Sequence, residues 1–126
     1  MKEEKIDVST FNWGPCVIKF KINDDCKKLL LKYGKKSQED TRDKLAGIID
    51  EEKAFSDEAK DKFLPYLSAY LGVYDQLFQK FTNKLYDKKP EYVLSSFWIN
   101  YQRAGEFNPP HDHDGKLSFV TYLQIP

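Results

Sequence analysis

Apolar residues recur at three- and four-residue steps between Leu67 and Leu85, and this is the longest regular pattern in the chain. The spacing puts them on one helical face and predicts a long amphipathic helix ending near Tyr86. Ser56, followed by two acidic residues, is the predicted N-cap of this region. Pro65 has no backbone N–H, so we expect a break and a second helix start there. The apolar face is expected to pack on a sheet.

Shorter elements are predicted before this helix. Residues 17–22 follow a Trp-Gly-Pro turn at 13–15, and their alternation of apolar and basic side chains predicts a half-buried strand. Asn23 is the expected N-cap of a short helix over residues 26–33, and Gly34 is expected to end it.

The stretch from residue 35 to residue 55 is rich in charge. Its one apolar island, Leu-Ala-Gly-Ile-Ile at 45–49, predicts only a short helix over 42–46 followed by a loop or short strand. The acidic run at 50–53 is interpreted as a solvated surface without a function.

Beyond Pro90 the hydrophobic period changes to two. Residues 92–102 are rich in aromatic and β-branched side chains, which favour a strand. A turn is expected at 103–106, and residues 117–125 predict another strand. The order of elements is therefore helices first and β structure afterwards.

Composition narrows the class of protein. With 126 residues and 40% hydrophobic content, the chain is expected to form one folded domain. Twenty basic and twenty acidic residues cancel, which argues against nucleic-acid and membrane partners. Cys16 and Cys26 fit no disulfide framework, and neither a signal peptide nor an apolar run of roughly 20 residues is present. We expect a soluble cytoplasmic protein.

Candidate chemistry lies at His111 and His113, the two histidines of the chain. Side chains at i and i+2 of an extended strand share a face, so the two imidazoles can take adjacent positions around one metal ion. Asp112 and Asp114 point the other way in a regular strand. They are expected to orient the imidazole rings, or one of them rotates in as a ligand. The alternative is a polar loop that carries two histidines and binds no metal.

The end of the chain resembles a known family. The residues that carry the resemblance are Trp98-Ile99-Asn100-Tyr101, Gly105, Pro110-His111-Asp112-His113, Leu117-Ser118, Tyr122-Leu123 and Pro126, with Trp13-Gly14-Pro15 and Leu45-Ala46-Gly47 earlier in the chain. They resemble the Fe(II)- and 2-oxoglutarate-dependent oxygenases, and among these the small prolyl-hydroxylase-like proteins of marine bacteriophages and bacteria. The resemblance implies an α+β fold with N-terminal helices packed on a double-stranded β-helix, or jelly roll.

The resemblance also implies a site and an activity. His111 matches the first metal ligand of the family's HxD motif, and Tyr101 and Tyr122 match tyrosines that contact 2-oxoglutarate. The implied protein is a dioxygenase that uses Fe(II), 2-oxoglutarate and dioxygen to hydroxylate an unactivated C–H bond of a protein or small-molecule substrate. A peptidyl proline is the substrate that the resemblance suggests, and a bacterial host's cytoplasm is the location if the gene is a phage gene.

The sequence departs from the family pattern at two points. His113 stands where most members have Asp, which leaves the second ligand open between His113 and a neighbouring acid. A distal His and a basic carboxylate clamp are expected tens of residues later, whereas only 34 residues follow Tyr92. An eight-stranded jelly roll needs about 70–100 residues.

We therefore expect residues 1–126 to be the N-terminal part of a longer domain. Residues 1–91 would form a strand and helical support, and residues 92–126 would begin a jelly roll that is truncated after its first strands. On its own this fragment is expected to be inactive, unless the missing ligands come from elsewhere in the chain or from a second subunit.

Two other functions remain open. Gly105 followed by His111 and His113 matches the opening of the cupin metal motif, although that motif wants a Glu where this chain has Leu117 and Ser118. The third candidate is a non-catalytic jelly-roll module with a binding or structural role.

Overall fold

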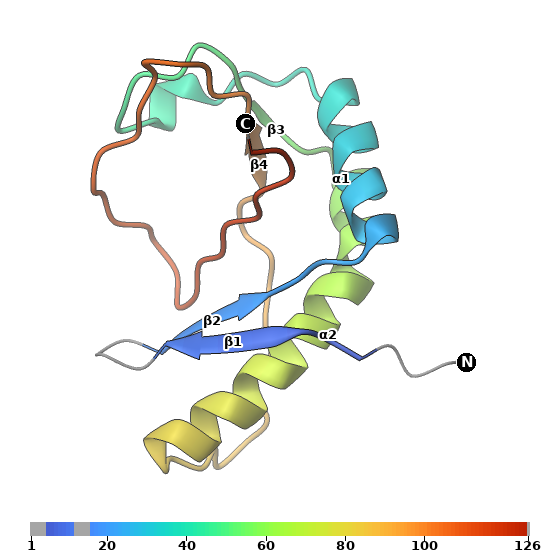
Figure 1. Cartoon of the computed structure of the whole chain (residues 1–126), viewed down its shortest axis with the longest axis vertical. Helices are drawn as coiled ribbons and strands as arrows, with labels where there is room; N and C mark the ends of the chain where they lie inside the picture. Colours follow the sequence, from blue (N-terminus) through green and yellow to red (C-terminus); the bar gives the residue numbers. More distant parts are fainter. Residues whose placement is uncertain (1–4, 12–15, 126) are drawn as a thin grey trace.

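The computed structural model describes residues 5–11 and 16–125, except for the side chain of Lys44. The predicted turn at 13–15 lies outside this range. The described helices are α1 (Asp24–Lys36), η1 (Arg42–Lys44, a 3-10 turn) and α2 (Asp57–Thr82), and the strands are β1 (Val8–Phe11), β2 (Val17–Phe20), β3 (Glu52–Ala54) and β4 (Trp98–Asn100). β1 pairs with β2 and β3 pairs with β4, both antiparallel, and the two helices pack against each other (Figure 1).

The expected jelly roll is wrong. The structure has two separate two-stranded sheets where the family would have a double-stranded β-helix. Of the predicted strand over 92–102 only Trp98–Asn100 forms, and within the described part of the chain residues 117–125 form no strand. The physical reason is pairing. A strand forms only beside a partner, and the described residues from 108 to 125 make no backbone–backbone hydrogen bond.

The β3–β4 pair is the part of the sheet structure that carries the later argument. Lys53 lies opposite Ile99, and Ala54 lies opposite Trp98. Residues 39–41 run along the other edge of β3, where the amide of Ala54 donates to the carbonyl of Glu39 (2.9 Å). β3 is therefore hydrogen-bonded on both sides over its short length.

An aromatic core joins the two helices to this sheet. Phe97 stacks on Phe55 (ring centroids 4.2 Å apart) and on Phe63 of α2 (4.7 Å). Leu30 of α1 and Ile99 of β4 close the same cluster. The predicted helix caps are confirmed, because Asn23 accepts a hydrogen bond from the amide of Cys26 and Ser56 accepts one from the amide of Ala59.

Gly34 does not end α1, contrary to the prediction. The helix continues to Lys36. A Cβ at Gly34 would lie 2.6 Å from Cδ1 of Ile99, so the missing side chain lets β4 approach the helix closely. The glycine has a packing role rather than a capping role.

Pro65 does not break α2, which also differs from the prediction. α2 is continuous from Asp57 to Thr82 and ends at Asn83, whose φ of 52° is left-handed. Pro65 and Asp61 are both exposed, so the carbonyl that loses its intrahelical donor can be hydrated. Farther along α2, Tyr70 contacts Phe20 of β2 (5.2 Å).

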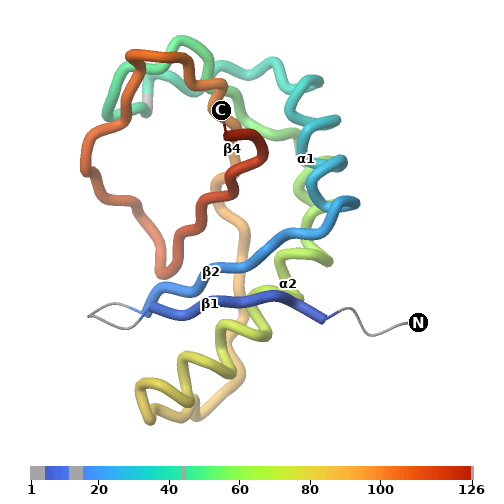
Figure 2. The backbone as a smooth tube through the Cα atoms, viewed as in Figure 1, coloured from blue at the N-terminus to red at the C-terminus, as the bar shows by residue number. Residues whose placement is uncertain are grey.

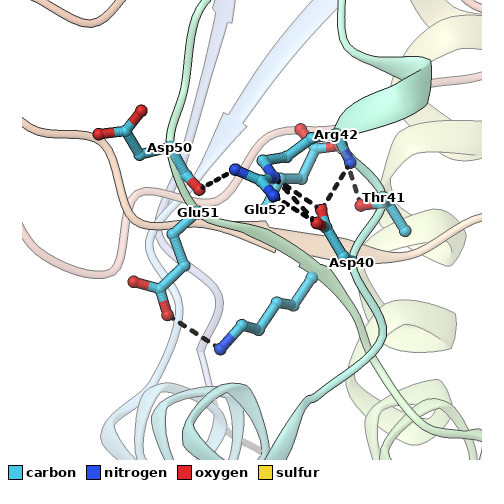
Figure 3. A network of polar contacts seen from close by, with 7 residues as sticks. Asp40, Thr41, Arg42, Asp50, Glu51 and Glu52 are labelled. Carbon is cyan, nitrogen blue, oxygen red and sulfur yellow. Dashed lines mark hydrogen bonds and ion pairs between the residues drawn. The ribbon is translucent and has the colours of Figure 1, made fainter.

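The acidic run at 50–53 is not simply a solvated surface, because Glu52 is only 4% exposed. Its Oε1 accepts a hydrogen bond from Thr41 Oγ1 (3.0 Å), whereas its Oε2 has no partner. Burial raises the pKa of the Glu52 carboxyl. Beside it, Arg42 bonds the carboxylate of Asp40 and the carbonyl of Asp50, which ties η1 to β3 (Figure 3).

Candidate functional site

His111 and His113 lie side by side on the segment that follows β4. Their ring centroids are 4.6 Å apart, and the ring planes meet at 68°. Both side chains are exposed. The surrounding backbone is not a strand, so the pair is brought together by the local path of the loop rather than by the pleat that the sequence suggested.

One imidazole has a defined orientation. Nδ1 of His111 lies 2.7 Å from the carbonyl oxygen of Pro109. A carbonyl oxygen only accepts hydrogen bonds, so Nδ1 carries the proton. When the ring is neutral, Nε2 keeps its lone pair, as in histidine ligands whose other nitrogen donates to a carbonyl.

The second imidazole, His113, packs near Trp98, the first residue of β4. The ring of His113 lies 5.8 Å from that of Trp98, at 31°. Trp98 precedes the buried Ile99 in β4, so its side chain points to the opposite face from Gly34 and α1. Trp98 thus connects an exposed loop to a hydrogen-bonded strand.

A second attachment fixes the approach to the histidines. Ile48 and Phe107 exchange two backbone hydrogen bonds, of 2.8 and 3.0 Å. A Cβ on the adjacent Gly47 would lie 2.0 Å from the carbonyl oxygen of Phe107 and 2.8 Å from Cδ of Pro109. Only glycine allows the chain to pass this close. Sequence reasoning named Trp98 and Gly47 among the residues that carry the family resemblance but assigned neither to the site. A glycine inside an apolar island was a further signal for Gly47.

The two tyrosines expected to contact 2-oxoglutarate have different surroundings. Tyr101 is half-buried, and its hydroxyl oxygen lies 3.0 Å from where a Cβ of Gly34 would be, so the phenol extends toward α1. Burial, followed by the nearby Glu51 carboxylate, raises the pKa of Tyr101. Tyr122 is 75% exposed. Their roles toward 2-oxoglutarate stay predictions.

A wide hollow of about 2240 Å³ adjoins both histidines and both tyrosines. Figure 2 shows the segment after β4 passing through an open arc and returning beside β4. His111, His113 and Trp98 line the hollow together with Tyr101 and Tyr122. Small-molecule sites usually measure about 300–1,000 Å³, so this hollow is larger than one cofactor needs.

The histidine pair supplies two metal donors. Among residues 5–11 and 16–125, no group of three or more His, Cys, Asp or Glu side chains is placed to hold a metal ion. Asp112 and Asp114 flank His113 but are exposed and do not complete such a group. The described residues thus place two imidazoles side by side without a third potential metal ligand beside them.

No helix in the part of the chain that the structure describes is long and apolar enough to cross a membrane. Comparison of the chain with known protein families, with characterised proteins and with solved structures found no match.

Proposed function

We propose that the chain binds one divalent transition-metal ion through His111 and His113, and that this metal serves a 2-oxoglutarate-dependent oxidation of a C–H bond. The observation that carries the proposal is the 2.7 Å contact between Nδ1 of His111 and the carbonyl of Pro109. It leaves Nε2 available as an electron-pair donor to a metal, and the centroid of the His113 ring lies 4.6 Å from that of His111.

The donor set narrows the choice of metal. Two imidazoles suit iron, cobalt, nickel, copper and zinc better than the hard cations calcium and magnesium. An oxygenase site of the two-His, one-carboxylate type needs a third protein ligand, and the two histidines fill two of the three positions. Asp112 and Asp114 are the nearest carboxylates in sequence, and rotation of either one toward the imidazoles would supply the third.

The oxidation itself rests on the resemblance of residues 98–126 to 2-oxoglutarate oxygenases. When bound, Fe(II) would supply the redox centre at which 2-oxoglutarate and dioxygen react. This chain's own residues have simpler tasks. Pro109 orients the first imidazole, Trp98 supports the second, and Tyr122 offers an exposed phenol that can donate to a carboxylate.

Calorimetric titration with Co(II), an air-stable substitute for Fe(II), tests the metal site. We expect one ion per chain, and at least about tenfold weaker binding when His111 or His113 is replaced by Ala. Lys116→Ala is the matched control, since Lys116 is exposed in the same segment, and it should bind as the wild type does. The absence of saturable binding by the wild type, or binding by both histidine variants as tight as that of the wild type, would contradict the proposal.

An anaerobic titration with Fe(II) and 2-oxoglutarate tests the oxidation separately. We expect 2-oxoglutarate to tighten Fe(II) binding, and, where Asp112 or Asp114 supplies the missing ligand, we expect succinate to form when dioxygen is admitted. Saturable Co(II) binding with no effect of 2-oxoglutarate would keep the metal site and remove the oxygenase function.

A further inference from the structure

Residues 117–125, Leu-Ser-Phe-Val-Thr-Tyr-Leu-Gln-Ile, form an uncharged apolar segment, of which the proposed site uses only the hydroxyl of Tyr122. Val120 is 76% exposed, Tyr122 75% and Ile125 75%. The segment contains no Gly or Pro and is rich in β-branched and aromatic residues, a composition that favours strand pairing between chains.

Its backbone has no backbone partner among the described residues. The described residues from 108 to 125 make no backbone–backbone hydrogen bond. Unpaired amides and carbonyls on a strand-forming segment are a template for the addition of another strand.

One face of the segment is already anchored. The ring of Phe119 lies 5.9 Å from the rings of Phe63 and Phe97, and Leu123 packs against the same core. Val120 and Tyr122 belong to the alternate set of positions and are turned to solvent. The anchored face fixes the position of the segment, while its backbone edge and its outer face stay open.

The order of residues makes this segment complementary to itself. In an antiparallel pair centred on Thr121, the opposing residues are Leu117 with Ile125, Ser118 with Gln124, Phe119 with Leu123, Val120 with Tyr122, and Thr121 with Thr121. Apolar positions then face apolar ones, the two polar positions face each other, and aromatic–β-branched and Thr–Thr pairs are favourable across strands. The flanking Lys116 of each copy would lie at opposite ends of the pair, without like-charge contact.

We propose that two copies of this chain associate through residues 117–125, as an antiparallel strand pair with its twofold axis at Thr121. The pairing satisfies the free backbone groups and covers Val120 and Tyr122, and it requires the bend at Leu123 to straighten. Both anchored faces lie on the same side of the new ribbon, so the two cores would sit side by side beneath it.

Sedimentation equilibrium over a range of protein concentrations tests the association. We expect a monomer–dimer equilibrium in the wild type. Val120→Lys should weaken it by about tenfold, because the symmetric pair contains two Val–Tyr contacts. Val93→Lys is the control, because Val93 is 89% exposed and lies outside the segment. A wild type that stays monomeric, or a dimer that Val120→Lys leaves unchanged, would overturn the proposal.

Cysteine crosslinking tests the register. In a Cys16→Ser background, where the remaining Cys26 is buried, Thr121→Cys should form a disulfide-linked dimer on mild oxidation. Val120→Cys should not, because its partner position is Tyr122. Crosslinking of Val120→Cys in preference to Thr121→Cys would overturn the register. Dimers that neither Thr121→Cys nor Val120→Cys crosslinks would point to association through another surface and would overturn the proposal as a whole.

Discussion

The packed part of the molecule, built from α1, α2 and β3–β4, contrasts with the open segment that follows β4. In the packed part, Cys26, Leu30 and Phe63 are at most 2% exposed, whereas every residue from 111 to 120 is exposed. The candidate metal site lies in the open segment, whereas the buried contacts that stabilise the fold lie in the packed part. Substitutions at the histidines should therefore report on function without unfolding the protein.

The largest expected loss of stability comes from a substitution within the packed part. Phe63→Ala removes a ring that stacks on Phe97 at 4.7 Å, and we expect a loss of about 3–5 kcal/mol in the free energy of unfolding. Phe119→Ala, in the open segment, touches the same rings but is 43% exposed, and should cost about 1 kcal/mol. Urea denaturation measures both. Equal losses would mean that the open segment belongs to the core.

Two glycines of the helices sharpen the contrast. Gly34→Ala places a Cβ 2.6 Å from Cδ1 of Ile99, so we expect a loss of about 1–3 kcal/mol. Gly72 in α2 has nothing within 4 Å of its would-be Cβ, so Gly72→Ala should instead stabilise the protein by about 1 kcal/mol. Thermal denaturation compares the two variants. Stabilisation by both would show that β4 does not approach α1 closely.

Gly47→Ala tests how the open segment is attached. Its Cβ would lie 2.0 Å from the carbonyl oxygen of Phe107, so the two hydrogen bonds between Ile48 and Phe107 should open at a cost of about 1–2 kcal/mol. The rates of amide hydrogen exchange at Ile48 and Phe107 should increase. The exchange rate at Leu30, in the packed part, should stay unchanged and among the slowest. Unchanged exchange at Phe107 would rule out this attachment.

The smallest effect concerns Glu52. Burial raises its pKa in the folded protein above the usual 4.5, so its contribution to stability is full below that value and is lost as the pH rises through the folded pKa. Glu52→Gln removes the titration and should be more stable than the wild type by about 1 kcal/mol at pH 7, with no advantage near pH 4. Urea denaturation at both pH values checks this, and a difference independent of pH would contradict it.

Local signals in the sequence predicted the local features. The caps at Asn23 and Ser56 and a helix over the periodic residues depend on neighbours within a few residues, and the structure has them. The helix ends at Thr82 rather than near Tyr86, and its buried residues, Ala59 and Phe63, precede the periodic face that was expected to pack on a sheet. The predicted strands depended on partners elsewhere in the chain, and residues 117–125 have none among the described residues. The jelly roll was implied by the family resemblance, and the periodicity of the sequence, which carries no information about a strand's partner, could not test it.

The candidate site likewise combines features that depend on local sequence with features that depend on contacts between distant segments. The proximity of His111 and His113 agrees with their spacing of two residues, but the strand from which it was predicted does not form there. The support of His113 by Trp98 and the passage of Pro109 across Gly47 are contacts between distant segments, so the sequence could not show them. Gly34 illustrates the same limit, because its packing role depends on Ile99.

Quenching of Trp98 fluorescence by Co(II) tests most directly whether a metal binds at the histidine pair on the open segment. Trp98 lies 5.8 Å from the ring of His113, so a bound Co(II) should quench its emission saturably at one ion per chain. Trp98→Phe, which keeps Trp13 as the other tryptophan, should lose the quenching but keep the calorimetric binding. We expect no saturable quenching in His111→Ala or His113→Ala. Quenching that persists in both histidine variants, or none in the wild type, would contradict the account.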